Sequence, residues 1–210
     1  MTNVMIVEDD PMAQKLLEIF VSENSGYQVL HTIESAAMAE FYCMTNLIDL
    51  ILMDVCTAMN VSGLEAAEKI KSRFPHIKII VITSLPECSF IDRARAAGVE
   101  SFWYKTASAE EILTVMDRTM AGEHIYPDCA PSLKLGEAFS ESFSERELEV
   151  LRLVVAGETD AAIAEKLFMS VRTVKQHSQS MREKTDFRNR TELAVRARES
   201  GLVINDQKNK

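Results

Sequence analysis

Short apolar runs alternate, through the first half of the chain, with stretches in which apolar residues recur at helical spacing. The runs are typical of buried strands and cover residues 3–7, 28–33, 50–53, 78–83 and 101–104. The helical stretches begin near residues 11, 36, 64, 89 and 108. Five strands that alternate with five helices predict an α/β fold built on a doubly wound, five-stranded parallel sheet.

Capping residues and glycines support these boundaries. Asp10 followed by Pro11 is a signal for a helix start, and Gly98 is a signal for a helix end. Ser108 with Glu111 has the spacing of a capping box. We therefore assign residues 1–121 to the first domain.

Residues 122–140 have no sustained period and contain Gly122, Pro127, Pro131 and Gly136. This composition predicts an interdomain linker. The alternative, a long loop inside one domain, is less common in compact proteins.

Residues 141–204 predict a second domain of four short helices. Ser144 with Glu147 is a further capping box, and Thr159, Ser170 and Asn189 are candidate caps for the next three helices. The helix, short turn and helix over residues 160–184 have the layout of a helix-turn-helix. Residues 205–210 are expected to form a flexible tail.

Charge divides along the chain in the same way. The formal net charge is −9, yet residues 1–121 hold 9 basic and 17 acidic side chains, whereas residues 166–198 hold 9 basic and 3 acidic ones. No apolar stretch approaches the roughly 20 residues that span a bilayer, and no signal pattern opens the chain, so we expect a cytoplasmic protein without membrane contact. The four cysteines have no metal-site or disulfide spacing.

Polar side chains follow the strands of the predicted sheet where each strand ends. Glu8 and Asp9 follow the first strand, Asp54 ends the third, Thr83 ends the fourth, and Lys105 follows the fifth. Because these ends converge at one edge of a doubly wound sheet, the side chains should share a pocket. Clustered carboxylates favour a divalent cation such as Mg²⁺ or Mn²⁺, and a hydroxyl with an ammonium suits phosphoryl oxygens. The pocket predicts an Asp54 carboxylate that attacks phosphorus.

At these residues the sequence resembles the receiver domain of two-component response regulators, which has a flavodoxin-like fold. The second domain resembles the LuxR-type helix-turn-helix through the segments FSERELEVL (143–151), IAEKL (163–167) and TVKQH (173–177). Together they resemble the NarL/FixJ class. The resemblance implies a regulator that is phosphorylated by a histidine kinase, dimerises, binds promoter DNA and controls transcription, with RNA polymerase as a further partner.

The resemblance also implies roles for residues of the pocket. Asp54 would be the phosphoacceptor, and Glu8 and Asp9 the acidic pair that holds Mg²⁺. The backbone carbonyl of Cys56 would complete the protein ligands. Thr83 and Lys105 would bind the phosphoryl group, and Phe102 would change rotamer together with Thr83.

The sequence departs from the receiver pattern at four points. The loop after Asp54 lacks the usual proline and is one residue longer before Gly63, so we expect a different path for it. Glu8 stands in place of the more usual aspartate, and its longer arm is expected to reach a metal through water. Thr106 follows Lys105, so no cis-proline is expected. Cys56 and Leu85 occupy the positions that flank the attacking water, and neither orients water strongly, which predicts slow self-dephosphorylation.

The helix over residues 170–184 is the candidate DNA-recognition helix. Its inward face is predicted to carry Val171, Val174, His177 and Met181. The residues predicted to contact DNA are Arg172, Thr173, Lys175, Gln176, Gln179 and Lys184. Contacts with DNA phosphates, rather than with bases, are predicted for Lys166, Arg172, Lys184, Arg188 and Arg190. His177 is interpreted as a structural residue. Thr185–Asp186 replaces the Leu-Gly usual in the family, which predicts a looser turn.

Other interpretations stay open at this point. Leu193, Ala194 and Ala197 of the last helix form either a dimer surface or part of the core. A phosphatase with Asp54 as nucleophile would need a second aspartate at position 56, where the chain has Cys56. An orphan regulator that binds DNA without phosphorylation is the remaining alternative.

Overall fold

We analysed a computed structural model, which describes residues 1–87, 89–105 and 109–203, with Ala109 and Glu110 described by their backbone only. The chain divides into two compact units. The first contains Met1–Ser84 and Cys88–Cys129, and the second contains the chain from Ala130 onward together with Leu85–Glu87. The expected tail at 205–210, the cap Ser108 and the peptide at Thr106 lie outside the described residues.

The first unit is the predicted doubly wound sheet. Its strands are β1 (Thr2–Val7), β2 (Tyr27–Ile33), β3 (Leu50–Asp54), β6 (Lys78–Thr83) and β7 (Ser101–Tyr104). They pair in parallel in the order β2-β1-β3-β6-β7, so the predicted fold class is confirmed. The middle strand, β3, is buried along its whole length.

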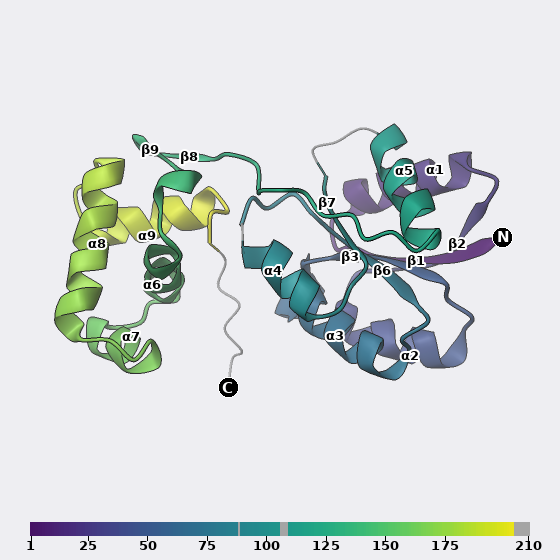
Figure 1. Cartoon of the computed structure of the whole chain (residues 1–210), viewed down its shortest axis with the longest axis horizontal. Helices are drawn as coiled ribbons and strands as arrows, with labels where there is room; N and C mark the ends of the chain where they lie inside the picture. Colours follow the sequence, from purple (N-terminus) through teal and green to yellow (C-terminus); the bar gives the residue numbers. More distant parts are fainter. Residues whose placement is uncertain (88, 106–108, 204–210) are drawn as a thin grey trace. The chain divides into compact units, whose positions relative to one another are not determined.

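Helices cover both faces of this sheet (Figure 1). One face carries α1 (Pro11–Glu23) and α5 (Ala109–Met120), and the other carries α2 (Ala39–Thr45), α3 (Gly63–Arg73) and α4 (Ser89–Ala96). Alternate strand residues such as Ile6, Leu52 and Trp103 form the core with α1 and α5. Two-sided burial explains why the strands are continuous apolar runs in the sequence.

Local signals fixed most helix starts. The Asp10 side chain accepts hydrogen bonds from the backbone N–H groups of Met12 and Ala13, as its cap position predicts. The helix expected to begin near residue 36 instead begins with a 3-10 turn, η1 (Ala36–Met38), capped by Ser35.

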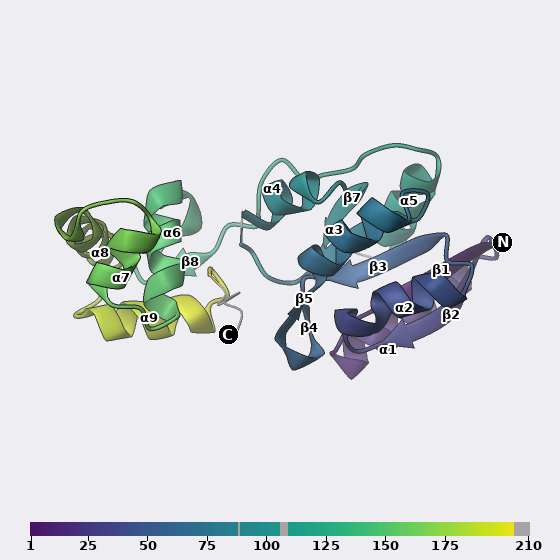
Figure 2. The same cartoon turned by 90° about the horizontal axis from the view of Figure 1, so that it is seen from below.

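The loop after Asp54 forms a small hairpin. Its strands are β4 (Cys56–Thr57) and β5 (Val61–Ser62), with the 3-10 turn η2 (Ala58–Asn60) between them. Figure 2 shows the hairpin beside the carboxyl end of β3. Met59 and Asn60 take φ values of 63° and 54°, the left-handed region that a tight hairpin turn requires. The extra residue of this loop is thus absorbed in the turn.

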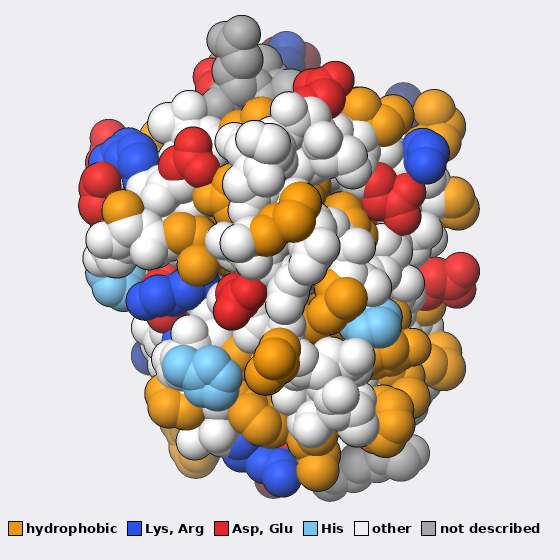
Figure 3. Space-filling model, turned by 90° about the vertical axis from the view of Figure 1, so that its right-hand side faces the viewer, with side chains coloured by type: hydrophobic (Ala, Val, Ile, Leu, Met, Phe, Trp, Pro, Cys, Tyr) orange, Lys and Arg blue, Asp and Glu red, His pale blue; other side chains and the backbone are white. Residues whose placement is uncertain are grey.

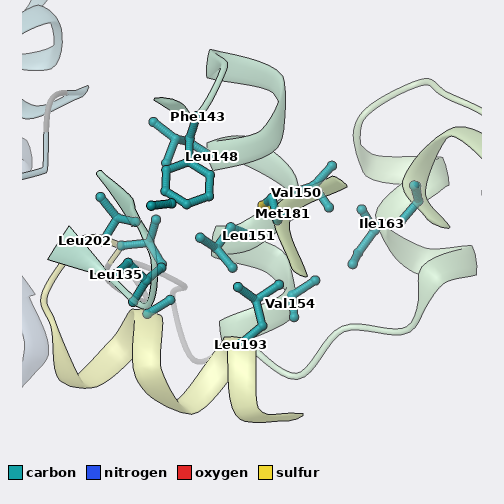
Figure 4. Packing of buried hydrophobic residues seen from close by; sticks show 14 of the residues in the cluster. Leu135, Phe143, Leu148, Val150, Leu151, Val154, Ile163, Met181, Leu193 and Leu202 are labelled. Atoms are coloured by element: carbon teal, nitrogen blue, oxygen red, sulfur yellow. The ribbon is translucent and has the colours of Figure 1, made fainter. Parts of the chain in front are cut away.

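The second unit contains the four predicted helices, α6 (Glu145–Val155), α7 (Asp160–Lys166), α8 (Val171–Thr185) and α9 (Arg190–Glu199). Ser144, Thr159, Ser170 and Asn189 each cap the helix that follows, as predicted. Their apolar faces meet in one core, in which Leu148, Leu151, Met181 and Leu193 converge (Figure 4).

Part of the predicted linker belongs to this second core. Residues 134–139 form a hairpin of β8 (Lys134–Leu135) and β9 (Ala138–Phe139), followed by the 3-10 turn η3 (Ser140–Ser142). Leu135 and Ala138 are buried in the core of α6–α9. The region predicted to be an interdomain linker is therefore ordered at residues 134–139, and two isolated buried residues give no period from which the hairpin could be predicted.

The surface carries mixed side chains. Figure 3 shows one face on which apolar, acidic and basic groups are interspersed. Among the described residues, no helix is both long and apolar enough to cross a membrane.

Candidate functional site

Asp54 lies at the carboxyl end of the central strand. It is the last residue of β3, and its side chain is 7% exposed. Val7 of β1 pairs with Met53, and Ile82 of β6 pairs with Asp54, so the neighbouring strands end at the same level. The residues that follow those strands are therefore delivered to one edge of the sheet.

The structure brings the predicted acidic residues together at this edge. One carboxylate oxygen each of Glu8, Asp9 and Asp54 lies within 4.8 Å of the others. Glu8 is buried, whereas Asp9 is exposed. This is the one such cluster of potential metal ligands in the part of the chain that the structure describes.

Lys105 closes the pocket from the end of β7. Its ammonium donates a hydrogen bond to Glu8 and lies 3.1 Å from Asp54 Oδ2. Its backbone N–H donates to the carbonyl of Thr83 at 2.9 Å, which couples the ends of β6 and β7. The ammonium thus compensates part of the negative charge of two buried carboxylates.

Burial dominates the acid–base properties of the pocket. Burial raises the pKa of Asp54 to about 7. The positive charge of Lys105 opposes this shift, whereas the negative charge of Glu8 adds to it. The Val55 N–H also opposes the shift, through a 2.7 Å hydrogen bond to the Asp54 carboxylate. Burial lowers the pKa of Lys105, but Asp54 and Glu8 outweigh that effect and raise it. The pocket therefore favours a further positive charge over a further negative one.

The donor set fits a hard divalent cation. Carboxylate oxygens at this separation, with one exposed member, match the ligands and open positions that Mg²⁺ requires. Cys56 begins β4 two residues after Asp54, and its carbonyl as a ligand stays a prediction.

The Thr57 hydroxyl ties the hairpin after Asp54 to the neighbouring segment and also braces the hairpin itself. The Thr57 hydroxyl accepts from the N–H of Ala36 at 3.0 Å and donates to the carbonyl of Val61 at 2.7 Å. Gly63 ends the loop, where an added Cβ would lie 1.8 Å from the carbonyl oxygen of Asp54. Glycine is thus required to bring the start of α3 against the carboxyl end of β3.

The two predicted switch residues are both buried. Thr83 is fully buried at the end of β6, and Phe102 is buried in β7. Tyr104 was not among the predicted site residues, although its ring packs edge-on against Phe102 with centroids 5.0 Å apart. Alternation along β7, which puts residues 102 and 104 on one face, was the signal for it. A coupled movement of Thr83 and Phe102 stays a prediction.

The exposed face of α8 contains most of the residues predicted to contact DNA. Arg172, Lys175, Gln176 and Gln179 are exposed, whereas Thr173 is half-buried and bonds to Ser170. Val171, expected on the inward face, is 41% exposed because it is the first residue of the helix and precedes the packed turns. Val174, Ser178 and Met181 form the buried face.

Lys184, which is predicted to contact DNA, is paired within the second unit, and its DNA contact stays a prediction. Its ammonium donates to Glu147 at 2.7 Å and to the carbonyl of Ser142 at 2.8 Å, and it lies over the Phe143 ring. Burial opposes the charged form of Glu147, yet bonds from Lys184, the Ser144 N–H and the Ser180 hydroxyl lower its pKa to about 2. Lys184 thus joins α8 to α6, and the sequence could not indicate this because its partner is 37 residues away.

Two of the predicted phosphate-contacting residues are also paired within the second unit. Lys166 pairs with Glu158, and Arg190 pairs with Asp160. Both cations stay partly exposed at the surface, and their contacts with DNA phosphates stay predictions.

The last helix and the turn before it are well packed. Leu193 and Ala197 are fully buried in the core of the second unit, which decides between the two roles considered for them. Thr185 is also buried and donates to the carbonyl of Met181 at 2.8 Å, so the expected loose packing is not found. Asp186 adopts φ 59° at the helix end, a conformation that aspartate tolerates better than most residues.

This combination of a receiver-type sheet with an acidic pocket and a four-helix unit containing a helix-turn-helix defines a class of two-domain regulators. The receiver domain family of response regulators matches residues 4–117, and the luxR family of bacterial regulatory proteins matches residues 141–197. The chain therefore belongs to the response regulators with a luxR-type domain.

Individual relatives cover nearly the whole chain. The response regulator protein VraR of Staphylococcus aureus is 30% identical over 208 residues, which is 95% of this chain and 98% of VraR. A solved RcsB–DNA complex has a TM-score of 0.63 at 21% identity and covers 93% of this chain and 96% of that one. ChrA, the response regulator of a heme-sensing two-component system, has a TM-score of 0.52 at 20% identity, covering 95% and 98%. At these identities the solved structures establish the fold.

Proposed function

We propose that Asp54 accepts a phosphoryl group from the phosphohistidine of a sensor kinase, and that this modification controls promoter binding by the second unit. The observation that carries the proposal is the pocket itself, in which Asp54 lies beside two further carboxylates and the Lys105 ammonium. In the transfer, an Asp54 carboxylate oxygen forms a bond to phosphorus while the bond from phosphorus to the histidine nitrogen breaks.

Each residue of the pocket has a defined task in this proposal. Glu8, Asp9, Asp54 and the carbonyl of Cys56 would hold Mg²⁺ or Mn²⁺, which would neutralise phosphoryl oxygens when bound. Lys105 would pair with a phosphoryl oxygen once its bond to Asp54 is lost. The hydroxyl of Thr83, at the end of the neighbouring strand, would turn towards the same group and draw Phe102 with it.

We assign residues 1–121 to the receiver domain and residues 141–204 to the DNA-binding domain, with the β8–β9 hairpin as an addition to the latter. Phosphorylation would favour a homodimer that binds two half-sites of promoter DNA. Solved RcsB structures are described as dimers bound to DNA and as bound to a promoter with the phosphomimetic BeF3−, which supports this order of events. To change the population from mostly inactive to mostly active, the phosphoryl group must favour the active state by about 5.5 kcal/mol.

The exposed face of α8 supports a role in base recognition. Arg172, Lys175, Gln176 and Gln179 would contact the major groove, with RNA polymerase as a further partner at the promoter. We propose a cytoplasmic regulator without turnover of other phosphomonoesters, because Cys56 stands where a phosphatase needs its general acid.

Intact mass measurement tests the first step. The full chain is incubated with Mg²⁺ and acetyl phosphate beside the variant Asp54→Ala, which removes the acceptor oxygen. We expect one added phosphoryl group in the wild type alone. No addition to a folded wild type would overturn the proposal and favour the orphan regulator.

A further inference from the structure

Gln179 and Glu183, on the exposed face of α8, are hydrogen-bonded to each other. Arg172, Gln176, Gln179 and Glu183 lie at positions i, i+4, i+7 and i+11, which places them in a single row along α8. All four are exposed. The buried residues Val174, Ser178, Met181 and Thr185 follow the same spacing on the opposite side. The fourth member of the exposed row is an acid, where repulsion from DNA phosphates would be expected to exclude one.

Glu183 is engaged with its neighbour in the row. The side-chain amide nitrogen of Gln179 donates a hydrogen bond to Glu183 Oε1 at 2.8 Å. A carboxylate only accepts hydrogen bonds, so this contact fixes which end of the amide is the nitrogen. In contrast, the side chains of Arg172, Lys175 and Gln176 make no hydrogen bond to other parts of the described chain.

We infer that Glu183 is a positioning residue that orients the Gln179 amide, so that Gln179 distinguishes A·T from T·A at one base pair of the target DNA. This inference rests on the proposed DNA-binding function. The amide keeps one N–H and its carbonyl oxygen free, and these match N7 and the N6 amino group of adenine. Without Glu183 the amide can turn by about 180° and exchange its donor with its acceptor, which fits the reversed base pair as well.

The inference also explains why an acid is present in this row. The charge of Glu183 should weaken binding to any DNA sequence through repulsion from phosphates. Its hydrogen bond should strengthen the preference for one sequence. Removal of Glu183 therefore raises non-specific affinity and lowers specificity, a combination that damage to the fold does not produce.

The first experiment identifies the base pair that Gln179 contacts. Acetyl phosphate-treated, full-length wild type and Gln179→Ala are each used to select duplexes from a randomised DNA library. The base pair at which Gln179→Ala loses its A·T preference identifies the position that Gln179 contacts. If the wild type selects no sequence, the proposed function fails together with this inference. If Gln179→Ala changes no position of a selected site, the inference alone is overturned.

The second experiment separates hydrogen bond from charge. Affinities of Glu183→Ala and Glu183→Gln are measured for the selected duplex, its A·T to T·A variant and a scrambled duplex. We expect the wild type to discriminate by about tenfold or more, and Glu183→Ala by less than about threefold. Glu183→Gln keeps an acceptor and should keep most of the discrimination. Both variants should bind the scrambled duplex about twofold more tightly at low salt.

Two controls complete the test. Glu68→Gln makes the same charge change on the exposed face of α3. It should alter neither the discrimination between A·T and T·A nor the affinity for the scrambled duplex. In the Gln179→Ala background, Glu183→Ala should have no further effect on discrimination, because the two residues act as one unit. Equal discrimination by wild type and Glu183→Ala would overturn the inference.

Discussion

The two functional regions of this protein are built in opposite ways. In the pocket, Asp54 and Glu8 are buried and held against Lys105, so charges that repel or attract strongly are fixed before any ligand binds. On α8, Arg172, Lys175 and Gln176 are exposed and make no hydrogen bond to the rest of the described chain. Substitutions in the pocket should therefore change folding stability as well as chemistry, whereas those at these three exposed residues of α8 should change DNA binding alone.

The largest effect is expected at Gly63. The Gly63→Ala variant places a methyl group on the carbonyl oxygen of Asp54, which must move away. We expect the free energy of unfolding to fall by about 3 kcal/mol, measured by urea denaturation. Gly26→Ala is the control, because an added Cβ there would meet only the Asn24 side chain, at 3.2 Å, and no backbone atom. Equal losses in both variants would show that close approach at Gly63 is unimportant.

Asp54→Asn should stabilise the protein in metal-free buffer. Because the pKa of Asp54 is raised from 3.8 to about 7, the folded state binds more protons than the unfolded state between these values. Wild-type stability should therefore decline as the pH rises from about 4 to about 7, and the variant should lack this decline. At pH 8 we expect a gain of about 2 kcal/mol.

The control for this variant is Asp49→Asn, before the other end of β3, where the carboxylate accepts a hydrogen bond from the Asn3 N–H. It should not stabilise the fold. A loss of stability in Asp54→Asn at pH 8 would contradict the account of the pocket.

A pair of lysine variants sharpens the comparison within α8. Lys184→Ala leaves the buried Glu147 without its cation and should lower the free energy of unfolding by about 2 kcal/mol. Lys175→Ala should leave stability unchanged, weaken DNA binding by about tenfold and reduce the salt dependence of binding by about one unit of slope. Thermal denaturation and fluorescence anisotropy measure the two effects. The reverse assignment of effects would show that Lys184 contacts DNA.

The smallest effect concerns the lifetime of the phosphorylated state. Hydrolysis needs a water molecule oriented in line with phosphorus, and neither Cys56 nor Leu85 holds water well. Cys56→Asn and Leu85→Glu should each shorten the lifetime, by about fivefold for an added polar group. Decay of the phosphorylated mass gives the rate. A lifetime that neither substitution changes would refute the prediction of slow dephosphorylation.

Elements that local chemistry determines could be predicted from the sequence. The Asp10 and Ser144 caps and the five apolar strands each depend on neighbours within a few residues, and their order was enough to bring Glu8, Asp54 and Lys105 together. Contacts between residues that are distant in the sequence could not be predicted in this way. The hairpin after Asp54 depends on a bond from Ala36 to Thr57, and the pairing of Lys184 depends on Glu147.

The central claim is that charge on Asp54 controls DNA binding by α8. Its most direct test is the affinity of the full chain for a duplex selected by the acetyl phosphate-treated protein, measured with and without acetyl phosphate and Mg²⁺. The account predicts a large gain in affinity on phosphorylation of the wild type and no gain in Asp54→Ala. Equal affinity in all four samples, with phosphorylation of the wild type verified by mass, would contradict it.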